Sequence, residues 1–334
     1  MKMKKLLCVS LCAAMVLAVA GCKKETKEET LKFGLGVYND ITQASNAEGD
    51  ANGQGKINSA IAVVTVDAEG KIVACQLDTS QIAVAYTAEG KAVANDSFAT
   101  KYELREGYNM KGASAIGKEW YEQADAFETV VCGKTLDEVK ALVAEGDKGT
   151  EEVINAGCTM KIQEFVLAIE KAYNNAAASE ATASCTLKVG ADTAQSCTDA
   201  TEEKDGQNQL STTIFAAAVD ADGKVVAATS DCVQVKFTFD ATGASTYDLT
   251  KEFRTKKEQG TDYGMSAYGS DKNGDGVVKE WNEQAAAFDA ACLGKTVEEI
   301  KALQGDDSYG NADLQTAGCT ITVDGFVKAA TKME

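Results

Sequence analysis

The stretch that decides the fold reads GKEWYEQADAF at residues 117–127 and recurs as VKEWNEQAAAF at residues 278–288. Together these stretches contain both tryptophans of the chain. In each of them Trp, Ala and Phe stand at positions i, i+4 and i+7, which is the spacing of one face of an α-helix. The recurrence predicts two copies of one unit, each organised around a helix with an apolar face.

Strand patterns precede this helix in each copy. In the first copy, apolar alternation predicts a short strand at 31–37, a hairpin made of 61–66 and 72–77, and a further strand at 82–86. Residues 39–56 have no apolar period and are expected to form a loop. Strands followed by helices favour an α+β fold. We therefore expect two tandem copies of an antiparallel sheet, each with one face covered by three C-terminal helices.

The length of 334 residues allows two domains of ordinary size, each burying its own core. We expect repeat domains at residues 31–177 and 178–334, with the boundary in a segment rich in Ala, Ser and Thr. They follow a signal peptide at residues 1–21 and a tether at residues 22–30.

The amino terminus indicates export. Residues 1–5 are basic and residues 6–20 are apolar, which suits a signal peptide and is short for a membrane-spanning helix. Residues 19–22, Val-Ala-Gly-Cys, resemble the lipobox of bacterial lipoproteins. The resemblance implies cleavage before Cys22, diacylglycerol on its sulfur, and attachment to the extracytoplasmic face of the cell membrane. The alternative is an ordinary secretory signal.

Composition excludes several classes of function. The chain has 33 Lys and Arg against 51 Asp and Glu, a formal net charge of −18. Such a chain lacks the basic surface that nucleic-acid binding requires. It contains no His. A Ser-His-Asp triad, a Cys-His dyad and a typical zinc site are therefore excluded.

The second copy carries an insertion before its Trp helix, DKNGDGVV at residues 271–278. Oxygen ligands at positions 1, 3 and 5 and Gly at position 6 resemble the calcium loop of EF-hand and dockerin proteins. Position 12 is Asn282, and Glu283 follows one place late. The resemblance implies calcium ligands at Asp271, Asn273, Asp275, Val277 and Glu283; the alternative is a solvated turn.

Eight cysteines follow Cys22, and export permits disulfides. Cys158 and Cys319 are repeat equivalents, both in the sequence Ala-Gly-Cys-Thr. The possible bridges are Cys132–Cys158, Cys292–Cys319 and Cys185–Cys197. The alternative is that these residues are small buried thiols. A thioredoxin-like motif is excluded because the chain contains no CxxC.

The residues before each final helix, 155–159 and 313–320, lead into a helix that closes an α+β unit. They resemble the FMN-binding domain family of exported bacterial proteins, in which a Ser or Thr bears flavin through a phosphoester. The resemblance implies FMN on Thr159 and Thr320, with Asp313 as the acidic residue upstream of Thr320. The whole pattern also resembles repeat lipoproteins of Gram-positive anaerobes.

Two functions follow from these patterns. One is a flavin-carrying lipoprotein that passes electrons outside the membrane to an envelope redox partner. The other is a non-catalytic binding or scaffold module of the cell envelope, and a hydrolytic enzyme is the weakest hypothesis. The charged residues that recur beside the two tryptophans line a ligand site or form the solvated face of a core helix; the spacing favours the core helix.

Overall fold

The computed structural model of the chain describes residues 28–268 and 278–333. Cys22 and four of the expected calcium ligands, Asp271, Asn273, Asp275 and Val277, lie outside the described residues. Within them, no helix is both long enough and apolar enough to cross a bilayer.

Each repeat begins with three long antiparallel strands. The first sheet has the order β4-β3-β2-β1-β5 and the second has the order β6-β7-β8. The strands are β1 (Lys32–Ser45), β2 (Gly53–Val66), β3 (Ile72–Tyr86), β4 (Ala92–Val93), β5 (Ala177–Ala178), β6 (Thr186–Thr198), β7 (Gly206–Val219) and β8 (Val225–Phe239).

Helices follow the strands in both repeats. In the first repeat they are α1 (Lys101–Leu104), η1 (Arg105–Tyr108), α2 (Trp120–Val131), α3 (Leu136–Lys140), η2 (Glu145–Asp147), α4 (Glu151–Ala156) and α5 (Gln163–Asn175), where η is a 3₁₀ helix. In the second they are α6 (Lys256–Gln259), η3 (Gly260–Tyr263), α7 (Met265–Tyr268), α8 (Trp281–Cys292), α9 (Val297–Lys301), α10 (Ala312–Thr316) and α11 (Asp324–Thr331). The α+β class with two antiparallel sheets is confirmed.

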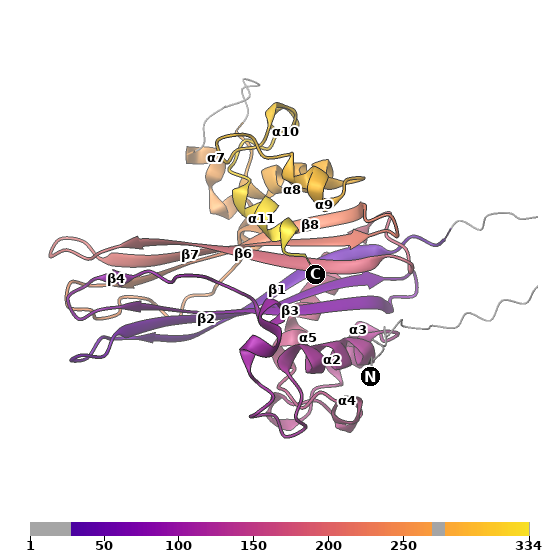
Figure 1. Cartoon of the computed structure of the whole chain (residues 1–334), viewed down its shortest axis with the longest axis horizontal. Helices are drawn as coiled ribbons and strands as arrows, with labels where there is room; N and C mark the ends of the chain where they lie inside the picture. The colour runs from indigo at the N-terminus through magenta and orange to yellow at the C-terminus, as the bar shows by residue number, and fades with distance from the viewer. Residues whose placement is uncertain (1–27, 269–277, 334) are drawn as a thin grey trace, which may run out of the picture.

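The elements form four layers: helices, sheet, sheet and helices (Figure 1). Along β2, Ala60, Ala62 and Val64 face the helices of their own repeat, whereas Ile61 and Val63 face the second sheet. Successive side chains of a strand point to opposite faces, so a strand buried on both faces needs an unbroken apolar run. Residues 60–64 form such a run.

The expectation of a separate core for each repeat is therefore incomplete. Each repeat has a core between its sheet and its helices, and a third core joins the inner faces of the two sheets. The predicted loop at residues 39–56 is also wrong in part, because β1 extends to Ser45 and β2 begins at Gly53. These polar ends are strand because their backbone groups pair across the hairpin.

An approximate twofold axis relates the repeats. The backbone N–H of Ala47 donates to the carbonyl of Gly243, and the N–H of Ala200 donates to the carbonyl of Gly90, both at 2.8 Å. Near them the ring of Tyr86 stacks on that of Phe239, its repeat equivalent, with centroids 4.3 Å apart.

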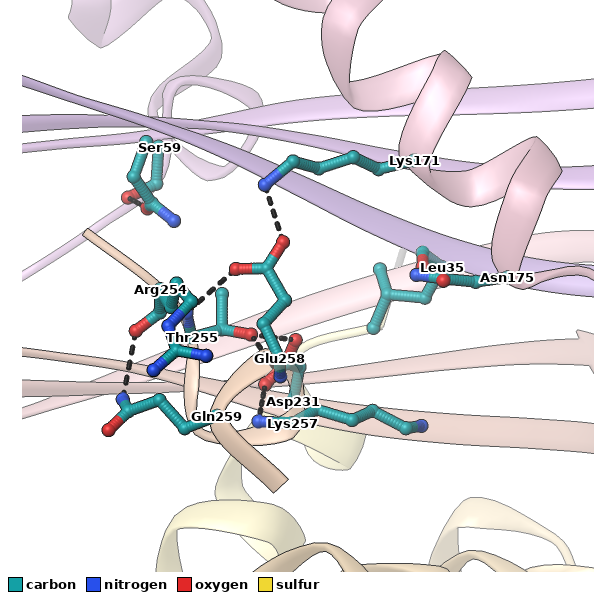
Figure 2. Close-up of polar contacts among 11 residues, drawn as sticks. Leu35, Ser59, Lys171, Asn175, Asp231, Arg254, Thr255, Lys257, Glu258 and Gln259 are labelled. Carbon is teal, nitrogen blue, oxygen red and sulfur yellow. Dashed lines mark hydrogen bonds and ion pairs between the residues drawn. The ribbon is translucent and has the colours of Figure 1, made fainter. Parts of the chain in front are cut away.

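Ion pairs follow the same symmetry. Figure 2 shows Lys171 of α5 pointing towards Glu258, which belongs to α6 of the other repeat. In the equivalent pair, Lys332 lies 3.6 Å from Glu103 of α1. Each contact thus occurs twice, with the roles of the repeats exchanged, as in an isologous dimer interface.

Candidate functional site

The recurring Lys-Glu-Trp segment has a structural role at the start of α2 and α8. The N–H of Glu119 donates to a carboxylate oxygen of Glu122 at 2.8 Å, and Glu280 and Glu283 make the same bond at 2.8 Å. These are capping boxes, which satisfy N–H groups that the first turn of a helix leaves unpaired. Glu283, an expected calcium ligand, therefore does what Glu122 does in the repeat without the insertion.

The glutamine of each segment holds the predicted flavin threonine. The side-chain oxygen of Gln123 accepts from Thr159 N at 2.9 Å and from Thr159 Oγ1 at 3.1 Å. Gln284 makes the same bonds to Thr320, at 2.8 Å and 3.0 Å. Both glutamines are buried. This Gln–Thr clasp ties the loop before the last helix to the Trp helix.

The glycine of the Ala-Gly-Cys-Thr motif has a structural role in both repeats. Gly157 and Gly318 have φ values of 105° and 99°, a left-handed conformation that glycine adopts readily. A Cβ at either position would overlap the ammonium group of Lys118 or Lys279. Asp313, the expected acidic residue, is exposed in the first turn of α10.

The second repeat contains a pocket of about 970 Å³ on the helix side of its sheet. Aromatic rings from η3, α8 and α11 (Tyr263, Trp281 and Phe326) line it, together with Gln284 and Thr320 of the clasp. The Trp/Ala/Phe stripes are core, as predicted, because Trp120 and Trp281 are both buried. Trp281 also forms part of the pocket wall.

Among the residues that the structure describes, four charged side chains line the pocket: Asp192, Asp324, Lys236 and Lys256. Asp192 lies 3.1 Å from Lys332 and Asp324 lies 2.7 Å from Lys328. Neither of those two lysines lines the pocket.

Both pocket lysines lack a carboxylate partner within the part of the chain that the structure describes. The ammonium group of Lys256 lies 5.0 Å from the ring centroid of Tyr263 and 5.4 Å from that of Trp281. Aromatic faces attract a cation but leave its charge uncompensated. The pocket therefore contains two ammonium groups without a carboxylate partner among the described residues, beside two aspartates that are paired elsewhere.

The eight cysteines within the described part of the chain are present as thiols. No disulfide joins Cys132 to Cys158, Cys292 to Cys319 or Cys185 to Cys197. Burial raises the pKa of the Cys319 thiol to about 12 and that of Cys232, in the pocket wall, to about 11. A thiolate is the nucleophilic form, so these thiols are unreactive at neutral pH.

Sequence reasoning missed a set of buried carboxylates. Asp78 and its equivalent Asp231 accept backbone N–H groups at the starts of α1 and α6. Burial raises the pKa of each to about 6. Figure 2 shows Asp231 beside Thr255, whose hydroxyl donates to it at 2.7 Å. The available signal was an Asp at the same place in both repeats, followed by Thr in the first and by Cys in the second. An Asp inside an apolar strand is easily taken for a turn.

Calcium binding stays a prediction. Among the described residues, no cluster of three or more His, Cys, Asp or Glu side chains could hold a metal ion. Glu283 is the one expected ligand within them, and its carboxylate serves the capping box.

Comparison with known proteins gives no relative, because no family model, curated protein or solved structure matches the chain. The function is therefore argued from the pocket and the two repeats.

Proposed function

We propose that the chain is a membrane-anchored, extracytoplasmic binding lipoprotein whose second repeat holds a small ligand. The observation that carries this proposal is the 970 Å³ pocket with its aromatic wall and two lysines that have no carboxylate partner among the described residues. Ligand pockets in proteins have volumes of roughly 300–1,000 Å³ and combine apolar walls with a few polar groups that orient the ligand. The first repeat then has a structural role.

The chemistry of the lining favours binding over catalysis. The pocket carboxylates of Asp192 and Asp324 are each held by a lysine outside it, so neither is poised as a general base. Cys232 is buried and its raised pKa keeps it protonated. The anchor is the lipid that the lipobox resemblance places on Cys22.

FMN is a second candidate occupant, and Thr320 is the observation that favours it. Of the two predicted flavin residues, Thr320 lines the 970 Å³ pocket. A phosphoester on its Oγ1 would replace the hydroxyl bond to Gln284 and leave the bond from Thr320 N in place. FMN would supply electron transfer, and the aromatic wall would contact its ring. The Gln–Thr clasp already explains why Thr159 and Thr320 recur, so we rank flavin second.

The test is native mass spectrometry and in-gel flavin fluorescence on protein purified from its own membrane. We expect a lipid mass that is lost in Cys22→Ala and a non-covalent small-molecule mass that is released on unfolding. A covalent flavin mass lost in Thr320→Val would establish the electron-carrier function instead. Protein that carries lipid alone and retains no small molecule in repeated preparations would contradict the binding function.

A further inference from the structure

The equivalent place in the first repeat shows which side chains differ around the pocket of the second repeat. Strand register aligns the repeats, because Asn58 pairs with Gln81 and Ser211 pairs with Gln234 at the same place in the two sheets. In the helices, the ring centroids of Phe165 and Trp120 lie 5.9 Å apart, and those of their equivalents Phe326 and Trp281 lie 5.8 Å apart. The residue before that Phe is Glu164 in the first repeat and Gly325 in the second.

In the first repeat a carboxylate fills the place that corresponds to the pocket. Glu164 projects from α5 and accepts a hydrogen bond from the amide of Asn58 on β2. Lys101 lies over the rings of Tyr108 and Trp120, at 5.0 Å and 5.9 Å from their centroids. Burial raises the pKa of Glu164, and the charge of Lys101 opposes that rise by stabilising the carboxylate.

The second repeat keeps the cation and has no carboxylate at the position of Glu164. Lys256 lies over Tyr263 and Trp281 as Lys101 lies over Tyr108 and Trp120. Gly325 replaces Glu164 and has no side chain, and Ser211 replaces Asn58 with a shorter one; both line the pocket. Both replacements shorten side chains in the pocket wall, near a lysine whose equivalent in the first repeat, Lys101, acts electrostatically on Glu164.

We propose that this pocket binds an organic carboxylate, whose carboxylate group takes the place held by that of Glu164 in the first repeat. Ser211 donates to this carboxylate as Asn58 donates to Glu164, and Lys256 stabilises its charge as Lys101 stabilises that of Glu164. Trp281 and Phe326 contact an apolar or aromatic body. The pocket is much larger than one carboxylate group, so the ligand has such a body. Asp192 and Asp324 do not compete for Lys256 because each is already paired. This inference rests on the proposed binding function and names its ligand class.

The wild-type test compares an acid with its neutral isostere. We would titrate the full chain with 3-phenylpropionate and with 3-phenylpropionamide, following tryptophan fluorescence and heat. A charge-assisted contact predicts that the acid binds about 10- to 100-fold more tightly than the amide. Equal affinities, tighter binding of the amide, or binding of neither probe would overturn the carboxylate inference.

Two variants locate the site. Lys256→Met is expected to lose the preference for the acid while its melting temperature stays close to that of the wild type. Gly325→Glu would place a carboxylate at the position of Glu164 and is expected to abolish binding. It is combined with Thr213→Ala, because a Cβ at residue 325 would lie 2.8 Å from Thr213 Oγ1. The first repeat has Ala60 at the position of Thr213. If either folded variant bound the acid as the wild type does, the site assignment would be wrong.

The converse variant is the matched control. Glu164→Gly in the first repeat removes the carboxylate on which Lys101 acts electrostatically, and is expected to add a second, weaker site for the acid. The two proposals can also fail separately. A neutral small molecule found on the native protein would support the binding function and overturn the carboxylate inference, whereas protein without any retained ligand would contradict the binding function itself.

Discussion

Replacement of Glu128 by Gln should stabilise the protein at alkaline pH. Glu128 lies on α2, and its carboxylate accepts a 2.6 Å hydrogen bond from the N–H of Leu77. Burial raises the pKa of this carboxyl from 4.5 to about 8, and the nearby charges of Asp125 and Asp78 add to the rise. The amide oxygen of glutamine can accept the same hydrogen bond, so the substitution removes the charge and keeps the contact.

The sign and size follow from proton linkage. A carboxyl whose pKa is higher in the folded than in the unfolded state favours folding below pH 4.5, and that advantage is lost as the pH rises through about 8. The two pKa values differ by about 3.5, equivalent to a ceiling of about 5 kcal/mol. Because the side chain is half-buried and partly screened by water, we expect about 1–2 kcal/mol.

The assay is urea denaturation at several values between pH 5.5 and pH 9, followed by tryptophan fluorescence. Glu128→Gln should gain free energy of unfolding over the wild type as the pH rises, with the largest gain at pH 9. Glu69→Gln, in the exposed turn between β2 and β3, is the matched control and should change little. A gain that does not vary with pH, or destabilisation of Glu128→Gln at every pH, would refute the reasoning.

Two further substitutions test the sheet interface and the clasp. Gly55→Ala should lower the free energy of unfolding by about 1–3 kcal/mol, because a Cβ there would overlap the ring of Phe237 from the other sheet. The control is Gly112→Ala, where a Cβ has open space. Equal effects of the two substitutions in thermal melts would contradict the sheet interface. Gln123→Met should cost about 2–4 kcal/mol, since it leaves the backbone N–H and the hydroxyl of Thr159 without their acceptor. A cost below about 0.5 kcal/mol in urea denaturation would show that water replaces the clasp.

Local patterns predicted much of the fold. The Trp/Ala/Phe spacing located α2 and α8. This spacing is a short-range signal, so it can be recognised in the sequence without knowledge of tertiary contacts. Residues 39–56 were missed because their strand conformation depends on pairing between β1 and β2 rather than on apolar alternation.

The arrangement of the layers was harder to predict from the sequence. The strand predicted at 61–66 lies within β2, but the surface that covers the inner face of β2 is a sheet more than a hundred residues away in sequence. The pocket was missed for a similar reason. The difference between Glu164 and Gly325 is visible once the repeats are aligned, yet it has no meaning until the structure places both residues beside a lysine and a tryptophan.

The shared core between the sheets has a consequence for the origin of the chain. A lone repeat would leave the inner face of its sheet, with residues such as Leu35, Ile61 and Val63, open to water. Such a unit would be stable as an obligate homodimer, and the exchanged contacts of Lys171 and Lys332 are those that two identical subunits would make. Gene duplication and fusion of that subunit would then have allowed the two halves to diverge, so that Gly325 leaves space in the pocket of the second repeat while Glu164 fills the equivalent place in the first.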